Sequence, residues 1–129
     1  MAIGSASGGR TPTGSGTSTG SAGWNLQLTS TTLTAAGRTL ATDATDITGT
    51  SAVACGSGAP CTLPVNGVAL PAAAPAGTPA PSPVKFFNAA TSSGVGRIDV
   101  TLDLATLVPQ NAFAGTYTST VTISVVSGP

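Results

Sequence analysis

The clearest pattern in the chain is an alternation of apolar and hydroxyl residues over positions 116–126. Tyr117, Val121, Ile123 and Val125 fall on one side of an extended chain, while Thr and Ser residues fill the other side. Successive side chains of a β-strand point to opposite faces, so this pattern predicts a strand with one apolar face. The abundance of β-branched residues also favours a strand over a helix.

Two further stretches repeat this design. Apolar residues alternate with polar ones over positions 24–29 and again over positions 97–104. Each amphipathic strand needs a second layer against its apolar face, which predicts two β-sheets packed on one another. We expect the core to contain the apolar sides of the three strands: Trp24, Leu26, Leu28, Ile98, Val100, Leu102, Tyr117, Val121, Ile123 and Val125.

Shorter segments complete the predicted architecture. We expect short strands at 38–41, 52–55 and 61–63, and a loop over 43–50 in which Ile47 is an anchor. An Asn-Gly pair at positions 66 and 67 lies between apolar residues, which is the composition of a tight hairpin turn. This pair therefore predicts a β-hairpin.

A proline-rich segment follows at positions 70–83. Its five prolines lack the amide donor of a strand, so we expect a surface loop or a sheet edge, either functional or a spacer. In the next strand, 84–88, Phe86 and Phe87 should point to opposite faces, with one ring in the core and the other exposed or at an interface. Residues 107–114 should form a connection with one short helical turn.

These elements predict an all-β protein. The expected fold is an antiparallel β-sandwich of about seven strands, Ig-like or jelly-roll-like, in one domain over residues 24–129. Residues 1–23 differ, because 16 of the 23 are Gly, Ser or Thr. Such a stretch buries too little apolar surface to offset its ordering entropy, so we expect an extended N-terminal tail.

Charge is nearly absent from the chain. Four basic residues balance four Asp, and there is no Glu or His. Scattered single cations make no basic patch, which argues against nucleic acid as a partner. Ser and Thr instead supply 36 of the 129 residues, a composition typical of secreted and assembling β-proteins, whose sheet edges lack the usual protection by charge. No apolar run is long enough to span a membrane. No signal peptide is visible, so we expect either that a signal peptide was removed before Met1 or that Met1 is not native.

Cys55 and Cys61 enclose a short Gly- and Pro-containing insert. A metal site needs more ligands than two thiols, and a redox pair usually has two intervening residues beside a helix. We therefore expect a structural disulfide, which implies an oxidising and hence extracellular compartment.

Candidate catalytic groups are few, and we expect no enzyme, no cofactor and no metal. Without His the usual nucleophile–base arrangements are impossible. Asp99 and Asp103 should lie on a solvated strand face, and Asp43 and Asp46 match no specific calcium loop. Lys85, the only lysine, is a candidate for an intramolecular isopeptide crosslink.

Both ends of the folded part resemble a surface-protein family. Gly23-Trp24-Asn25-Leu26 is similar to the first Trp-x-Leu motif of WxL-type cell-surface domains, and segment 115–125 resembles their last strand, with Ile123 and Val125 in place of its Trp and Leu. The resemblance implies an extracellular β-sandwich associated with the Gram-positive cell wall. By composition and build, the chain more broadly resembles secreted β-sandwich subunits of bacterial and archaeal surface fibres.

The leading hypothesis is a structural subunit that self-assembles head-to-tail into an extracellular, pilus-like filament. A terminal segment of one subunit would add as a strand to the sheet edge of the next. The alternative is a monomeric module that binds cell wall or glycan, for which exposed aromatic residues would be required, and a capsid or decoration protein is a third possibility. Expected subunit contacts lie in the tail and the proline-rich loop: Ile3, Arg10, Pro12, Pro75 and Pro79.

Overall fold

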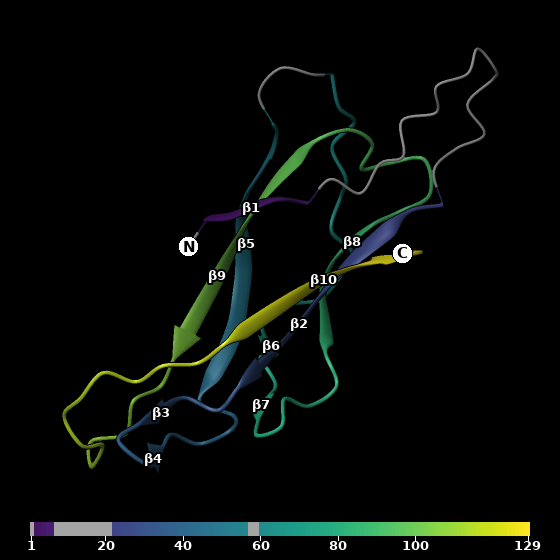
Figure 1. Cartoon of the computed structure of the whole chain (residues 1–129). Coiled ribbons are helices and arrows are strands. Elements are labelled where there is room, and N and C mark those ends of the chain that lie inside the picture. Colours follow the sequence, from purple (N-terminus) through teal and green to yellow (C-terminus); the bar gives the residue numbers. More distant parts are fainter. Residues whose placement is uncertain (1, 7–21, 57–59) are drawn as a thin grey trace.

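The computed structural model describes residues 2–6, 22–56 and 60–129. The described residues form ten strands and no helix, and the strands make two facing sheets and a small hairpin (Figure 1). This architecture confirms the prediction of a β-sandwich. No described segment offers a helix that could cross a membrane.

The strands fall into two principal sheets. Sheet A has the order β1 (Ala2–Ala6), β9 (Ile98–Thr106), β5 (Thr45–Cys55) and β6 (Ala72–Ala73). In sheet B, β2 (Trp24–Thr31) is central, with β10 (Val121–Ser127) on one side and both β8 (Val84–Ala89) and β7 (Ala76–Gly77) on the other. The separate hairpin is β3 (Thr34–Ala35) with β4 (Arg38–Thr39). Among the described pairings, all are antiparallel except the two-residue β2–β7 pairing, which is parallel.

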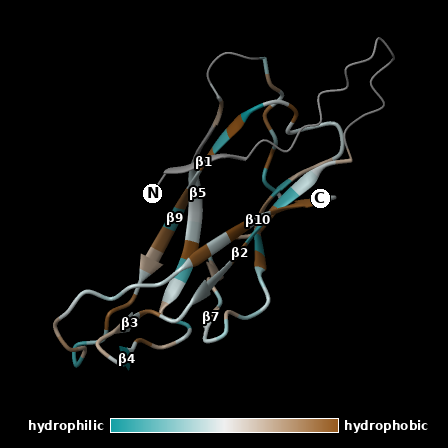
Figure 2. Ribbon diagram, in the orientation of Figure 1, coloured by the Kyte–Doolittle hydropathy of each residue, from teal (hydrophilic) through white to brown (hydrophobic). Residues whose placement is uncertain are grey.

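The core lies between the two sheets. The apolar sides of β2 and β9 meet there, and Figure 2 shows β9 banded by this alternation. Side chains from β5, β8 and the segment after β6 complete it. The buried residues are Trp24, Leu26, Leu28, Ile47, Ala74, Phe86, Phe87, Ala89, Ile98, Val100 and Leu102. Six of the predicted core residues are therefore buried, namely those on β2 and β9.

The prediction that the apolar face of the last strand lies in the core was wrong. β10 begins at Val121 rather than at Thr116, and Val121 and Val125 are 37% and 49% exposed. β10 is the edge strand of sheet B, at the rim of the core, so only the central Ile123 packs against the core and is partly buried. Tyr117 lies before the strand and is half-buried outside the core.

Both phenylalanines of β8 are buried, with Phe86 1% and Phe87 0% exposed. The prediction that one ring would be exposed was wrong because the strand does not alternate regularly at this point. Leu26 of β2 pairs with Phe87 and Gln27 pairs with Lys85, so Phe86 is an extra residue in a β-bulge. A bulge re-aims side chains, and here it places both rings in the core.

The predicted Asn-Gly hairpin is also absent. Residues 63–67 form no strand. The Asn66 side-chain oxygen accepts a bond from the Val68 amide at 3.0 Å, and the Asn66 side chain also bonds to β8. Its side-chain amide donates to the Phe86 carbonyl at 3.1 Å, and its side-chain oxygen accepts from the Asn88 backbone amide at 3.1 Å. The Gly67 amide in turn donates to the Asn88 side chain at 2.7 Å. These bonds attach the segment to the edge of β8.

Three smaller expectations also change. The predicted loop 43–50 mostly belongs to β5, an 11-residue strand with irregular register near Gly49 that buries Ile47 completely. Positions 61–63 contribute only an isolated bridge between Thr62 and Val95. The connection after β9 has no helical turn; the Ala112 amide bonds to the Pro109 carbonyl at 2.9 Å and closes a simple turn.

The two long sides of the sandwich differ. On one side, the proline-rich segment crosses between the sheets, because β6 pairs with β5 in sheet A and β7 pairs with β2 in sheet B. Placement of these short strands at sheet edges agrees with the prediction made from the prolines. On the other side, sheet A ends at β1 and sheet B ends at β10. On this second side, β1 and β10 each have one strand edge that pairs with no other described strand.

Candidate assembly edges and surface pocket

The N-terminal strand β1 occupies the edge of sheet A. It runs antiparallel to β9, with Ala2 opposite Thr101, Ile3 opposite Val100, and Ala6 opposite Ile98. The strand follows from main-chain pairing rather than from an apolar pattern, since four of its five residues are Ala, Gly or Ser. Part of the predicted tail is thus a sheet strand, and β9 would be the edge of sheet A without it.

Of the five predicted subunit-contact residues, the three that the structure describes do not lie together. Ile3 lies on β1, whereas Arg10 and Pro12 fall outside the described residues. Pro75 lies between β6 and β7, at the end of sheet A opposite to β1, and its carbonyl accepts bonds from the amide and the hydroxyl of Ser30 at 2.9 and 3.1 Å. Pro79 is exposed in the loop after β7.

The second open edge is that of β10. This strand pairs with β2 in an unbroken register over seven residues and contains no charged residue and no proline. Its exposed apolar residues are Val121, Val125 and Val126. Natural edge strands are usually protected by charge, proline, a bulge or short length, and β10 has none of these devices.

A small apolar groove opens between the sheets near the start of β10. Leu28, Leu104 and Val121 line it, and its volume is about 120 Å³. Leu104 and Val121 are 38% and 37% exposed, so the groove brings apolar surface from both sheets to solvent. The sequence pattern assigned Val121 to the core and could not show this gap.

Hydroxyl groups fix the segment that leads into β10. The Thr120 amide donates to the Thr31 hydroxyl at 2.8 Å, and the Ser119 hydroxyl donates to the Thr31 carbonyl. Thr34 and Thr118 exchange two backbone hydrogen bonds of 3.0 Å. These bonds hold residues 118–120 against the end of β2 and the β3–β4 hairpin.

A surface pocket lies where the hairpin meets the connection between β9 and β10. The Arg38 guanidinium on β4 stacks over the Phe113 ring, with its central carbon 3.4 Å from the ring centroid. The Tyr117 hydroxyl donates to the Phe113 carbonyl at 3.3 Å. With Asn111 and Pro109 these residues line an open pocket of about 300 Å³. Phe113 is 59% exposed, so this is the exposed aromatic residue that the binding-module hypothesis requires.

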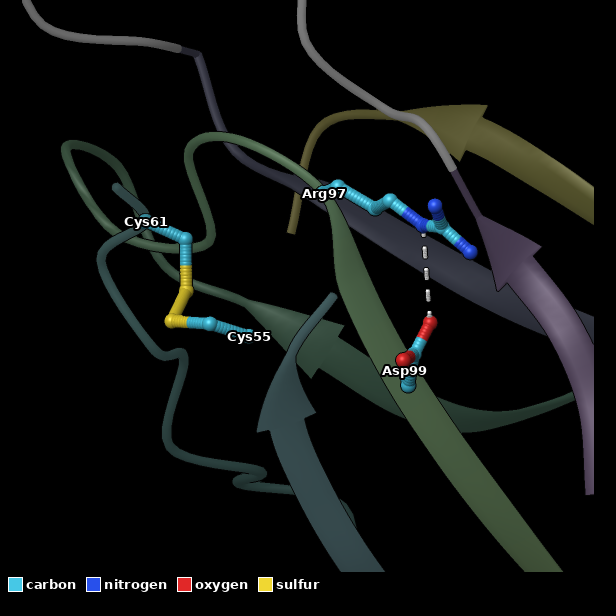
Figure 3. A network of polar contacts seen from close by, with 4 residues as sticks. All are labelled: Cys55, Cys61, Arg97 and Asp99. Carbon is cyan, nitrogen blue, oxygen red and sulfur yellow. Dashed lines mark ion pairs between the residues drawn. A yellow bond between two sulfur atoms is a disulfide. The ribbon is translucent and has the colours of Figure 1, made fainter. Parts of the chain in front are cut away.

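The disulfide is confirmed. Cys55 at the end of β5 bonds to Cys61, with 5.7 Å between the α-carbons (Figure 3). The adjacent Gly56 amide donates to the Arg97 carbonyl at 2.9 Å, and a β-carbon at Gly56 would overlap the Arg97 side chain. Arg97 also forms an ion pair of 3.9 Å with Asp99, in which both side chains are about half exposed. The bridge is therefore tied to the start of β9.

The remaining candidates for chemistry stay separate. Within the described ranges, no three acidic or Cys side chains come together in a group that would hold a metal ion. Asp43 lies in a loop, and Asp46 lies on β5. Lys85 is exposed on β8 and forms no ion pair with another described residue.

Comparisons with known proteins found no matching family model, no matching curated protein and no matching solved structure. The WxL-type resemblance therefore stays a prediction, and any functional argument depends on the edges and the pocket of this molecule.

Proposed function

We propose that the chain is a structural subunit that assembles into an extracellular filament by exchange of its N-terminal strand. In this proposal β1 of one copy leaves its own β9 and pairs with β9 of the next copy. The observation that carries it is the position of β1, which lies on the edge of sheet A, is held there by main-chain pairing, and is followed by a Gly/Ser/Thr-rich segment.

The pairing of β1 has the properties that strand exchange requires. The same register with β9 is available within one chain or between two, because backbone groups make the contact. About 15 residues, 7–21, separate β1 from the next described residue, and a chain of that length reaches at most about 50 Å. A connection of this length allows β1 to pair with β9 of a neighbouring copy.

Charge and compartment support the same function. The chain has only eight charged side chains among 129 residues and no net charge, so electrostatic repulsion between neighbouring copies is weak. The Cys55–Cys61 disulfide fits an oxidising environment such as the outside of the cell. An unprotected β10 edge offers lateral contacts between filaments or subunits.

A disulfide reporter tests the exchange. Ala2 and Thr101 are directly opposite in the β1–β9 register, and opposite residues of antiparallel strands have α-carbons about 4.5–5.5 Å apart, which suits a disulfide. The double variant Ala2→Cys/Thr101→Cys is assembled, oxidised and run on a non-reducing denaturing gel. Exchange predicts a covalent ladder of multimers, whereas a β1 that stays on its own chain gives a monomer band.

A matched control fixes the register. In Ala2→Cys/Thr106→Cys the second cysteine lies five residues further along β9, about 17 Å away, so no ladder is expected. Electron microscopy of the full chain and of a chain lacking residues 1–23 completes the test. The shortened chain should stay folded, since the described core comes from other strands, and form no filaments. Filaments from the shortened chain, or no assembly of the full chain, would overturn the proposal.

A further inference from the structure

A second site on the molecule is independent of assembly. The pocket defined by Arg38, Asn111, Phe113 and Tyr117 lies at the end of the sandwich that carries β3 and β4, away from β1 (Figure 1). It is built by two segments about 75 residues apart in the chain, the hairpin and the β9–β10 connection. The β3–β4 hairpin is held in place by the paired backbone bonds between Thr34 and Thr118.

The charge of this pocket is not neutralised. Arg38 forms no ion pair with any described carboxylate, whereas Arg97 is paired with Asp99. No acidic residue lines the pocket, so Arg38 carries its only formal charge. In a protein with four cations in total, one exposed guanidinium in a hollow is a local positive centre.

The guanidinium is also pre-positioned. The cation–π contact holds the central carbon of the guanidinium over the Phe113 ring, 3.4 Å from the ring centroid. No hydrogen bond joins the side chain of Arg38 or that of Asn111 to another described residue, although the Arg38 backbone pairs with Ala35 in the hairpin. A fixed guanidinium with free in-plane donors matches the two oxygens of a carboxylate and loses little side-chain entropy on binding.

The surroundings of Arg38 match a sugar ring. Phe113, Tyr117 and Pro109 provide apolar surface for the C–H groups of a pyranose, while the Asn111 amide and the Thr39 hydroxyl provide hydrogen-bonding groups for its hydroxyls. We propose that this pocket binds a carboxylate-bearing sugar residue, a uronic acid or a related acidic saccharide unit, with Arg38 on the carboxylate and the aromatic residues against the ring.

Titration of the full ¹⁵N-labelled chain tests this site with three probes: D-glucuronate, D-glucose and acetate. Glucuronate should shift the signals of the Arg38 side-chain N–H and the Asn111 amide, and bind at least about tenfold more tightly than either other probe. Equal binding of acetate would show a simple carboxylate contact and overturn the sugar assignment. Equal binding of glucose, or no shift with glucuronate, would overturn the role of Arg38.

Variants locate the binding within the pocket. Arg38→Gln should weaken glucuronate binding at least about tenfold, and Arg38→Lys should recover only part of it, since an ammonium keeps the charge and loses the two-pronged geometry. Phe113→Leu should also weaken binding because the guanidinium loses its stacking surface. Arg97→Gln is the matched control, an exposed arginine elsewhere, and should bind like the unmodified chain. Unchanged binding in Arg38→Gln with a native spectrum would exclude this pocket.

Discussion

Gly94 packs its α-carbon against the buried tryptophan. Its carbonyl accepts a hydrogen bond from the Trp24 indole at 2.7 Å, and its φ is +63°. A β-carbon at this position would lie 2.6 Å from the Ala89 β-carbon and 2.7 Å from the Trp24 indole nitrogen. Non-bonded carbons pack at about 3.5–4.0 Å, and both neighbours are buried. Gly94→Ala must therefore displace Trp24 or Ala89.

The cost has two parts that a second glycine separates. A left-handed backbone disfavours an L-residue by about 1–2 kcal/mol, and overpacking a core typically costs about 1–3 kcal/mol. Gly94→Ala should therefore lower the free energy of unfolding by about 2–5 kcal/mol. Gly37, in the turn between β3 and β4, has a φ of +78° and nothing within 4 Å of an added β-carbon. Gly37→Ala should therefore show only the backbone part.

Urea denaturation measures this difference. Trp24 is the only tryptophan and is 3% exposed, so its fluorescence reports on unfolding, with far-UV circular dichroism as the second probe. Both variants should unfold at lower urea with an unchanged slope, and only Gly94→Ala should alter the emission of the folded state. If the two variants lose equal stability, the close packing of Gly94 on Trp24 and Ala89 is refuted.

Three further outcomes follow from burial and from the edges. Replacing Cys55 and Cys61 together by Ser should cost about 2 kcal/mol, since the bridge closes a short loop; calorimetry measures it as a lower Tm. Leu28→Ala, at a 1% exposed site, should cost about 2–5 kcal/mol, whereas Val125→Ala on the open edge of β10 should cost less than about 1 kcal/mol in the same urea assay. Val125→Lys should leave the fold intact and reduce lateral aggregation in light scattering, because a charge protects an edge strand; unchanged scattering would argue that the β10 edge makes no contacts.

The sequence predicts strands better than it predicts what covers them. Alternation identified β2 and β9 together with their buried faces, because side-chain direction in a regular strand is a local property. The same alternation in β10 led to a wrong prediction of burial, because the apolar face of a strand does not show whether a second sheet covers it. Val125 is exposed because β10 stands at the rim, which is a fact of topology.

Local signals also failed where one side chain or one extra residue changes the geometry. The β-bulge in β8 places both Phe86 and Phe87 in the core. The sequence of this strand gives no local signal that predicts the bulge. The Asn66 side chain bonds to a strand 20 residues away, and no β-hairpin forms at the Asn-Gly pair. The Arg38–Phe113 contact joins segments that are distant in the sequence, so no local sequence motif indicates the candidate binding pocket.

The proposed strand exchange would give either closed dimers or open chains, and we expect the length of the segment between β1 and β2 to determine how readily β1 leaves its own chain. Pairing of β1 with its own β9 benefits from a high effective concentration, as long as the connecting segment spans the distance. Deleting residues 9–18 should strain pairing within the chain and favour pairing between chains, as short hinges do in swapped proteins. Light scattering after size exclusion should then show oligomers at lower protein concentration than for the full chain. Reciprocal exchange would stop at a dimer, whereas successive one-way exchange grows with concentration. An oligomer threshold that the deletion leaves unchanged or raises would show that β1 is not the exchanged strand, and a shifted threshold with dimers alone would keep the exchange but exclude the filament.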